Sequence, residues 1–195
     1  PTFPGTSRAP ILRISEINAT ARFNTDTYSR PIVQKDDLQA SILLAENDLK
    51  TFEAHIREKQ RAGLDVSAAE QQDADVKQTI ELLKTTYSKS DYVRALAVLD
   101  QVRESLIQGE RDLDRTYTDS EIRKSTMALS RLDLEIGWFT GNASTKTYPG
   151  LQPIQYDRNS AYVRILNATA AMNAGLFEPA RADAGIGFET ANSTY

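Results

Sequence analysis

Cysteine is absent from the 195-residue chain, and histidine and tryptophan occur once each, as His55 and Trp138. Without cysteine the chain forms no disulfide, binds no metal through thiolates and has no thiol nucleophile. A Ser-His-Asp site needs a histidine as its base, so His55 would have to serve alone, from the middle of a helical pattern. We therefore interpret His55 as a structural residue at the surface or half buried.

Metal and cofactor motifs are also scarce. A di-iron bundle uses a Glu-x-x-His motif on each of two helices, and a single histidine excludes that arrangement. The acidic pairs Asp73/Asp75 and Asp112/Asp114 could in principle bind Mg²⁺ or Ca²⁺, but we interpret them as solvated helix faces. Glycine loops that cradle phosphates are missing. We predict no catalytic residue, no cofactor and no metal, and therefore a protein that is not an enzyme.

Long hydrophobic runs are missing too: residues 42–45 and 95–99 are typical of the longest, far below the roughly 20 residues of a membrane helix. The net charge of −4 argues against direct binding of nucleic acid. We expect a soluble chain without membrane insertion, either in a virion or cytoplasm, or as a processed lumenal or secreted protein. It is open whether Pro1 follows a trimmed methionine or a removed targeting segment. Four Asn-x-Ser/Thr sites, at Asn18, Asn142, Asn167 and Asn192, would carry glycans only if the chain is secreted, which is the less favoured reading.

What the sequence does contain is a long stretch of amphipathic helix. Six apolar residues recur at alternating steps of four and three, which places them on one seam of a helix: Leu38, Ile42, Ala45, Leu49, Phe52 and Ile56. Such spacing is typical of helical bundles and coiled coils. We predict that this first helix begins at Asp36 or Asp37 and ends near Ala62, with Gly63 as its C-terminal glycine.

Three more helices are predicted from capping signals. Ser67 and Glu70 have the spacing of a capping box and open the second helix. The third begins after 88–91, and we expect Gly109 to stop or kink it, because glycine costs about 1 kcal/mol in a helix interior. A second capping box, at Thr118 and Glu121, opens the fourth helix, which ends by Gly141. The predicted fold is all-α: an antiparallel bundle of about four helices over residues 36–140.

Two arms flank this bundle. Residues 1–35 contain four prolines, which exclude a long helix, and they carry five basic and two acidic residues, a balance of +3. The bundle carries fourteen basic and twenty-one acidic residues, a balance of −7. A basic arm could therefore lie on its own acidic bundle or on a neighbour's, or its arginines could simply be solvated. For residues 141–195 we predict a loop, a short fifth helix that ends at Gly175, and an extended tail.

The arms carry aromatic and apolar side chains of the kind that anchor a chain on a partner. Together with the aromatic pair at the end of the fourth helix, they form the predicted partner-docking set: Phe3, Ile11, Ile14, Phe23, Tyr28, Trp138, Phe139, Phe177, Phe188 and Tyr195. We predict a non-enzymatic structural or assembly subunit that docks on protein subunits of a large complex, copies of itself among them. A virion head–tail or connector component is one example.

An alternative comes from a similarity of arrangement. A proline-containing arm before a four-helix bundle resembles the extrinsic PsbQ-type subunits of photosynthetic complexes. That resemblance is one of architecture and rests on no shared motif. It implies a subunit bound peripherally to a photosynthetic or other membrane complex.

Overall fold

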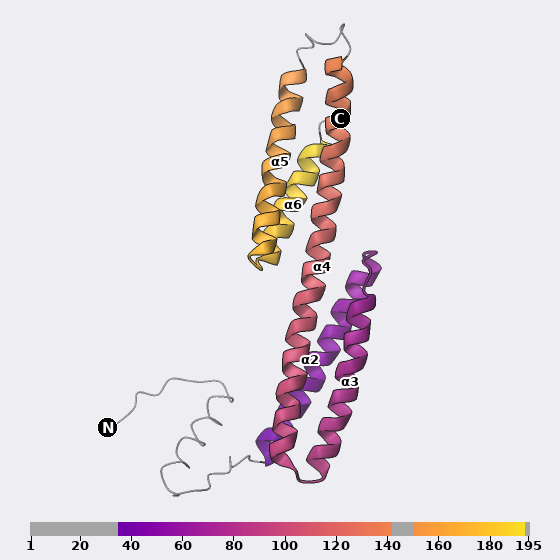
Figure 1. Cartoon of the computed structure of the whole chain (residues 1–195), viewed down its shortest axis with the longest axis vertical. Coiled ribbons are helices and arrows are strands. Elements are labelled where there is room, and N and C mark those ends of the chain that lie inside the picture. The colour runs from indigo at the N-terminus through magenta and orange to yellow at the C-terminus, as the bar shows by residue number, and fades with distance from the viewer. Residues whose placement is uncertain (1–34, 142–149, 194–195) are drawn as a thin grey trace, which may run out of the picture. The chain divides into compact units, whose positions relative to one another are not determined.

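The computed structural model describes residues 35–141 and 150–193 of the chain. This part is all-α, as predicted, and contains no strand (Figure 1). Consecutive helices run antiparallel (Figure 1). The helices are α2 (Lys35–Arg61), α3 (Ser67–Ser88), α4 (Tyr92–Gly141), α5 (Leu151–Asn173) and α6 (Phe177–Asn192). The arm predicted for residues 1–35 lies outside the described residues, except that Lys35 opens α2.

The chain divides into two compact units. The first unit comprises the described residues up to Ala54 together with Glu70–Ile107. The second unit comprises His55–Ala69 and the residues from Gln108 onward. Helices α2, α3 and α4 therefore each contribute residues to both units.

The first unit buries one apolar seam from each of its three helices. Five of the six predicted seam residues of α2 are buried in it, with Phe52 fully covered, whereas the sixth, Ile56, belongs to the second unit. Ion pairs flank the seam on the α2–α3 side: Lys84 lies 2.8 Å from Glu46, and Lys77 lies 2.7 Å from Glu53. The hydrogen bonds that both lysines donate to their acidic neighbours raise the pKa of each lysine above the ordinary value. On the other side, Gln72 donates a hydrogen bond to the backbone carbonyl of Ser105.

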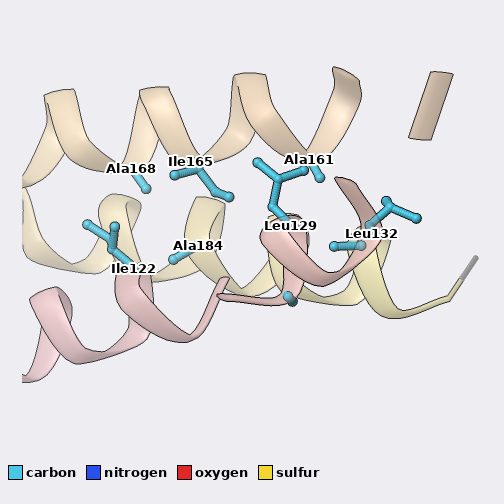
Figure 2. Packing of buried hydrophobic residues seen from close by; sticks show 9 residues of the cluster. Ile122, Leu129, Leu132, Ala161, Ile165, Ala168 and Ala184 are labelled. Carbon is cyan, nitrogen blue, oxygen red and sulfur yellow. The ribbon is translucent and has the colours of Figure 1, made fainter. Parts of the chain in front are cut away.

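The core of the second unit is built from small as well as large side chains (Figure 2). Helix α4 contributes Ile122, Leu129 and Leu132. The facing helices contribute mainly alanines: Ala161 and Ala168 from α5, and Ala180, Ala184 and Ala191 from α6, all fully buried. Side chains this small let α5 and α6 lie close together, and Gly187 is buried between them. The hydroxyl of Ser125 on α4 donates to the carbonyl of Ala184 at 2.6 Å.

Three turns confirm the predicted ends of helices. Gly63 and Gly175 have φ values of 82° and 76°, in the left-handed region that favours glycine. Ser90 adopts the same conformation at the end of α3, with φ 62°. Helix α4 then begins as expected, because Asp91 accepts a hydrogen bond from the backbone N–H of Arg94.

The predicted break between a third and a fourth helix is wrong, because α4 is one helix of 50 residues. Gly109 is buried within it and does not end it. Thr118 is not an N-cap: its hydroxyl donates to the carbonyl of Asp114, four residues back in the same helix, at 2.7 Å. Glu121 pairs instead with Lys124, one turn ahead. The spacing of a capping box thus arose here from ordinary mid-helix residues.

The predicted extended tail is also wrong, because residues 177–192 form α6. The buried face of α6 consists of alanine and glycine. Hydrophobic periodicity depends on large apolar residues and is weak in such a helix. The short fifth helix predicted to end at Gly175 is confirmed as α5, which spans Leu151–Asn173.

Candidate docking surface

The outer face of α4 in the second unit carries a row of exposed apolar side chains. Met127, Leu134 and Trp138 are separated by steps of seven and four, so they share one side of the helix. Their exposed fractions are 57%, 75% and 64%. The core residues Ser125, Leu129 and Leu132 lie on the opposite side. We call Met127, Leu134 and Trp138 the α4 outer row.

Trp138 is held beside Phe139 at the end of α4. The two rings meet edge to face with their centroids 5.1 Å apart, an arrangement that aromatic pairs favour. Phe139 is half buried, whereas Trp138 projects from the helix. The contact restricts the indole without covering it. Trp138 therefore presents a large and partly ordered apolar surface.

Charged side chains border the α4 outer row. Arg123 pairs with Asp119, and Lys124 pairs with Glu121, each within α4. Arg131 is exposed between Met127 and Leu134 and has no ion-pair partner among the described residues. An exposed tryptophan, methionine and arginine on one face match the residue types that are enriched in protein interfaces.

Helix α5 carries a second exposed apolar row on its own outer side. Tyr156, Tyr162, Val163 and Leu166 are all exposed there, whereas Ala161, Ile165 and Ala168 on the other side are buried. In this unit, α4 and α5 therefore each have an apolar side that the described residues leave uncovered. Of the 15 large apolar side chains exposed in the described chain, ten belong to the second unit.

The predicted docking residues differ in their exposure to solvent. Trp138 is exposed, Phe188 is 41% exposed, and Phe139 and Phe177 are half buried. Six of them lie outside the described residues: Phe3, Ile11, Ile14, Phe23, Tyr28 and Tyr195. Sequence reasoning missed Met127 and Leu134, although their distance of one heptad from each other was a usable signal.

The clustered polar side chains of the second unit contact one another. His55 is half exposed, and its Nδ1 lies 2.9 Å from a carboxylate oxygen of Glu110. Two cations lie over the ring of Tyr117, with Lys59 Nζ at 4.2 Å and the Arg181 guanidinium at 5.4 Å from its centroid. Arg181 also donates to Asp114 at 3.0 Å. These contacts join residues of α2, α4 and α6.

The acidic pairs considered as metal ligands take part in similar contacts. Asp73 pairs with Lys77, and Asp112 accepts hydrogen bonds from Gln108. Across residues 35–141 and 150–193, no three histidine or acidic side chains are grouped so as to hold a metal ion. In the same residues, no helix combines the length and the apolar character needed to cross a membrane.

Comparison with known proteins adds no family to this description. No family model, curated protein or solved structure matches the chain. Functional inference therefore depends on the surfaces described above.

Proposed function

We propose that this chain is a non-enzymatic structural or assembly subunit that docks on neighbouring protein subunits of a large complex, for example a virion head–tail or connector component. The supporting observation is the exposure of Trp138 in line with Met127 and Leu134. Monomeric proteins rarely leave large apolar side chains gathered on one face without a binding role. Tryptophan and arginine are also the residues that most often dominate binding energy when a partner covers them.

The α4 outer row suits a partner with an apolar groove and a carboxylate. The three apolar side chains would fill the groove, and Arg131 would gain an acidic partner that it lacks among the described residues. The flanking pairs Arg123–Asp119 and Lys124–Glu121 would remain as a polar rim.

A subunit of the PsbQ type bound to a membrane complex remains the alternative. Its resemblance depended on an arm followed by four helices in residues 36–140. That range contains three helices, so no particular observation favours the alternative.

The proposal is tested by crosslinking in the native source of the protein. A photoreactive amino acid placed at position 138 should crosslink to a neighbouring subunit. The same group at Gln101, which is exposed on α4 in the first unit, should not. Crosslinking that is absent at position 138, or equal at both positions, would contradict docking through the α4 outer row.

The captured subunit can then be used for measurements of affinity. Leu134→Ala and Trp138→Ala should each weaken its binding at least about tenfold, or ~1.4 kcal/mol. Ile107→Ala is the matched control, because Ile107 is also exposed on α4 but lies outside the row. Trp138 is the sole tryptophan, so the emission of the chain should shift to shorter wavelength when the partner covers it.

A further inference from the structure

We infer that the outer face of α5 is a self-association surface, on which a second copy of this chain packs its own α5 antiparallel to the first. This face is separate from the α4 outer row. The inference therefore goes beyond the proposed function and can fail without affecting it.

The first observation is a second heptad-like seam on α5. Five exposed residues follow one another at alternating steps of three and four: Tyr156, Asn159, Val163, Leu166 and Ala170. The opposite seam, with Ala161, Ile165 and Ala168, is buried against α4 and α6 (Figure 2). A helix whose two sides both follow this spacing has the pattern for packing on both sides. The described residues cover only one of them.

The second observation is the absence of charge on this outer face. Helix α5 contains three charged residues, Asp157, Arg158 and Arg164. Both arginines are paired with neighbouring helices of the unit: Arg158 Nε lies 2.7 Å from Asp133, and Arg164 Nη1 lies 2.7 Å from Asp183. Arg158 Nη1 also donates to Asn159 Oδ1 at 3.3 Å, at the edge of the outer face, where Asp133 compensates its charge. Asp157 is half buried and lies one turn before the buried Ala161, on the inner side. The outer face therefore carries apolar side chains with Gln, Asn and Ser, in a chain that is 26% charged.

Symmetry explains why an uncharged face favours a second copy. In a two-fold interface the same patch appears on both sides, so a charge near the axis meets its own like charge. The chain has a net charge of −4, and the outer face of α5 avoids this repulsion. The Oδ1 of Asn159 accepts a hydrogen bond from Arg158 at 3.3 Å, and its amide N–H groups can donate to an asparagine of the other copy. A helix that lies on a membrane surface carries Lys and Arg along its polar side, and α5 lacks them there.

The positions of the exposed residues select an antiparallel register. With the two-fold axis at Leu166, the leucine meets its own copy. Asn159 then faces Asn173 of the second copy, because each lies seven residues from the axis. Asn173, the last residue of α5, is also exposed. Val163 lies beside the smaller Ala170 of the other copy, so large and small side chains alternate across the seam.

The experiment uses the full chain. Because this chain lacks cysteine, any disulfide crosslink must come from the introduced cysteines. The mass in solution, from light scattering, should be twice 21.7 kDa. Under mild oxidation, Leu166→Cys should give a disulfide-linked dimer. A mixture of Asn159→Cys and Asn173→Cys should crosslink to each other, whereas Asn159→Cys alone should not. Crosslinking of Asn159→Cys alone would indicate a parallel pair and overturn the proposed register.

Charge at the axis gives the second arm of the test. Leu166→Glu should weaken dimerisation at least about tenfold, because it places two carboxylates against each other at the axis. Val163→Glu should do the same, because it places a carboxylate against the apolar Ala170 of the other copy. Circular dichroism checks that both variants keep their helices. Leu82→Glu is the matched control, since Leu82 is a similarly exposed leucine on α3, and it should leave the dimer intact. Trp138→Ala should also leave it intact, which separates this inference from docking through α4.

Three outcomes would overturn the inference. One is a chain that stays monomeric at a concentration of about 100 μM, well above the micromolar range of ordinary transient contacts. Another is a dimer that is indifferent to both glutamate variants. The third is a monomer that binds anionic vesicles and loses this binding in Leu166→Glu, which would assign the face to a membrane surface.

Discussion

Single residues decide how closely α5 and α6 approach each other. A Cβ atom at Gly187 would lie 3.4 Å from the carbonyl oxygen of Ala161, from Arg164 Cβ and from Ile165 Cγ1. One methyl group is therefore in ordinary contact there, and any larger side chain must displace α5. Gly185, two residues earlier in the same helix, has nothing within 4 Å of the corresponding position.

These two glycines give opposite expectations for one substitution. Gly187→Leu should lower the free energy of unfolding by about 1–3 kcal/mol, because the packed hairpin cannot hold the added atoms. Gly185→Leu should raise it by up to about 1 kcal/mol, because leucine is the better helix former. Urea unfolding of the two variants checks both values. Equal effects would show that α6 does not approach α5 as closely as described.

Asp65 is a residue whose contact makes stability depend on pH. Its carboxylate accepts a hydrogen bond from the backbone N–H of Ser67 at 3.1 Å, and this bond lowers its pKa. A carboxyl group whose pKa is lower in the folded state stabilises the fold above its ordinary pKa of about 3.9. That contribution is lost as the pH falls through the folded value.

Asp65→Asn should therefore be less stable than the parent chain at pH 7, and the difference should shrink as the pH falls below 4. Urea midpoints of both proteins, measured from pH 7 to about pH 2.5, provide the comparison. A difference that stays constant over this range would show that the charge of Asp65 does not support the start of α3.

At the scale of helices, the sequence predicts an element correctly where its terminal residues or its large apolar residues follow a characteristic pattern. Left-handed glycines end α2 and α5 as expected, and the large apolar residues of α2 identify its buried side. Prediction from the sequence fails where the same residue pattern can occur in two different local structures. Thr118 with Glu121 has the spacing of a helix start but lies inside α4. The buried alanines of α6 lack the periodicity that large side chains would give.

Proline at position 119 distinguishes the two interpretations of α4. If Thr118 capped a helix, Asp119 would be its first residue, where proline is well tolerated. Inside a continuous helix, Asp119→Pro should cost about 3 kcal/mol or more. Thermal unfolding followed by circular dichroism measures the loss. Asp119→Ala is the control, because it removes only the exposed pair with Arg123 and should cost less than about 1 kcal/mol.

At the scale of the whole molecule, the candidate site was only partly predictable. Trp138 could be named because it ends a helix beside another aromatic residue. The apolar row of α5 could not, because exposed and buried apolar residues at helical spacing look alike until their neighbours are known. Both surfaces belong to the second unit, where most of the exposed large apolar side chains occur.

The dimer inferred from α5 should be nearly insensitive to salt. No ion pair would cross the uncharged face, so its dissociation constant should change by less than about threefold between 50 and 500 mM NaCl. Sedimentation equilibrium at several salt concentrations measures this constant. A decrease in affinity of about tenfold or more would indicate that charged side chains take part and that the copies meet through another face.

The alanine and glycine seam of α6 also limits which changes the second unit can accept over evolutionary time. At Ala180, Ala184, Gly187 and Ala191 nearly every substitution enlarges the side chain, so selection for folding alone would preserve these positions. The outward side of α5 is under no such restriction from its own fold. If homologues nevertheless keep that side apolar and free of charge, the constraint must come from a molecule that touches it.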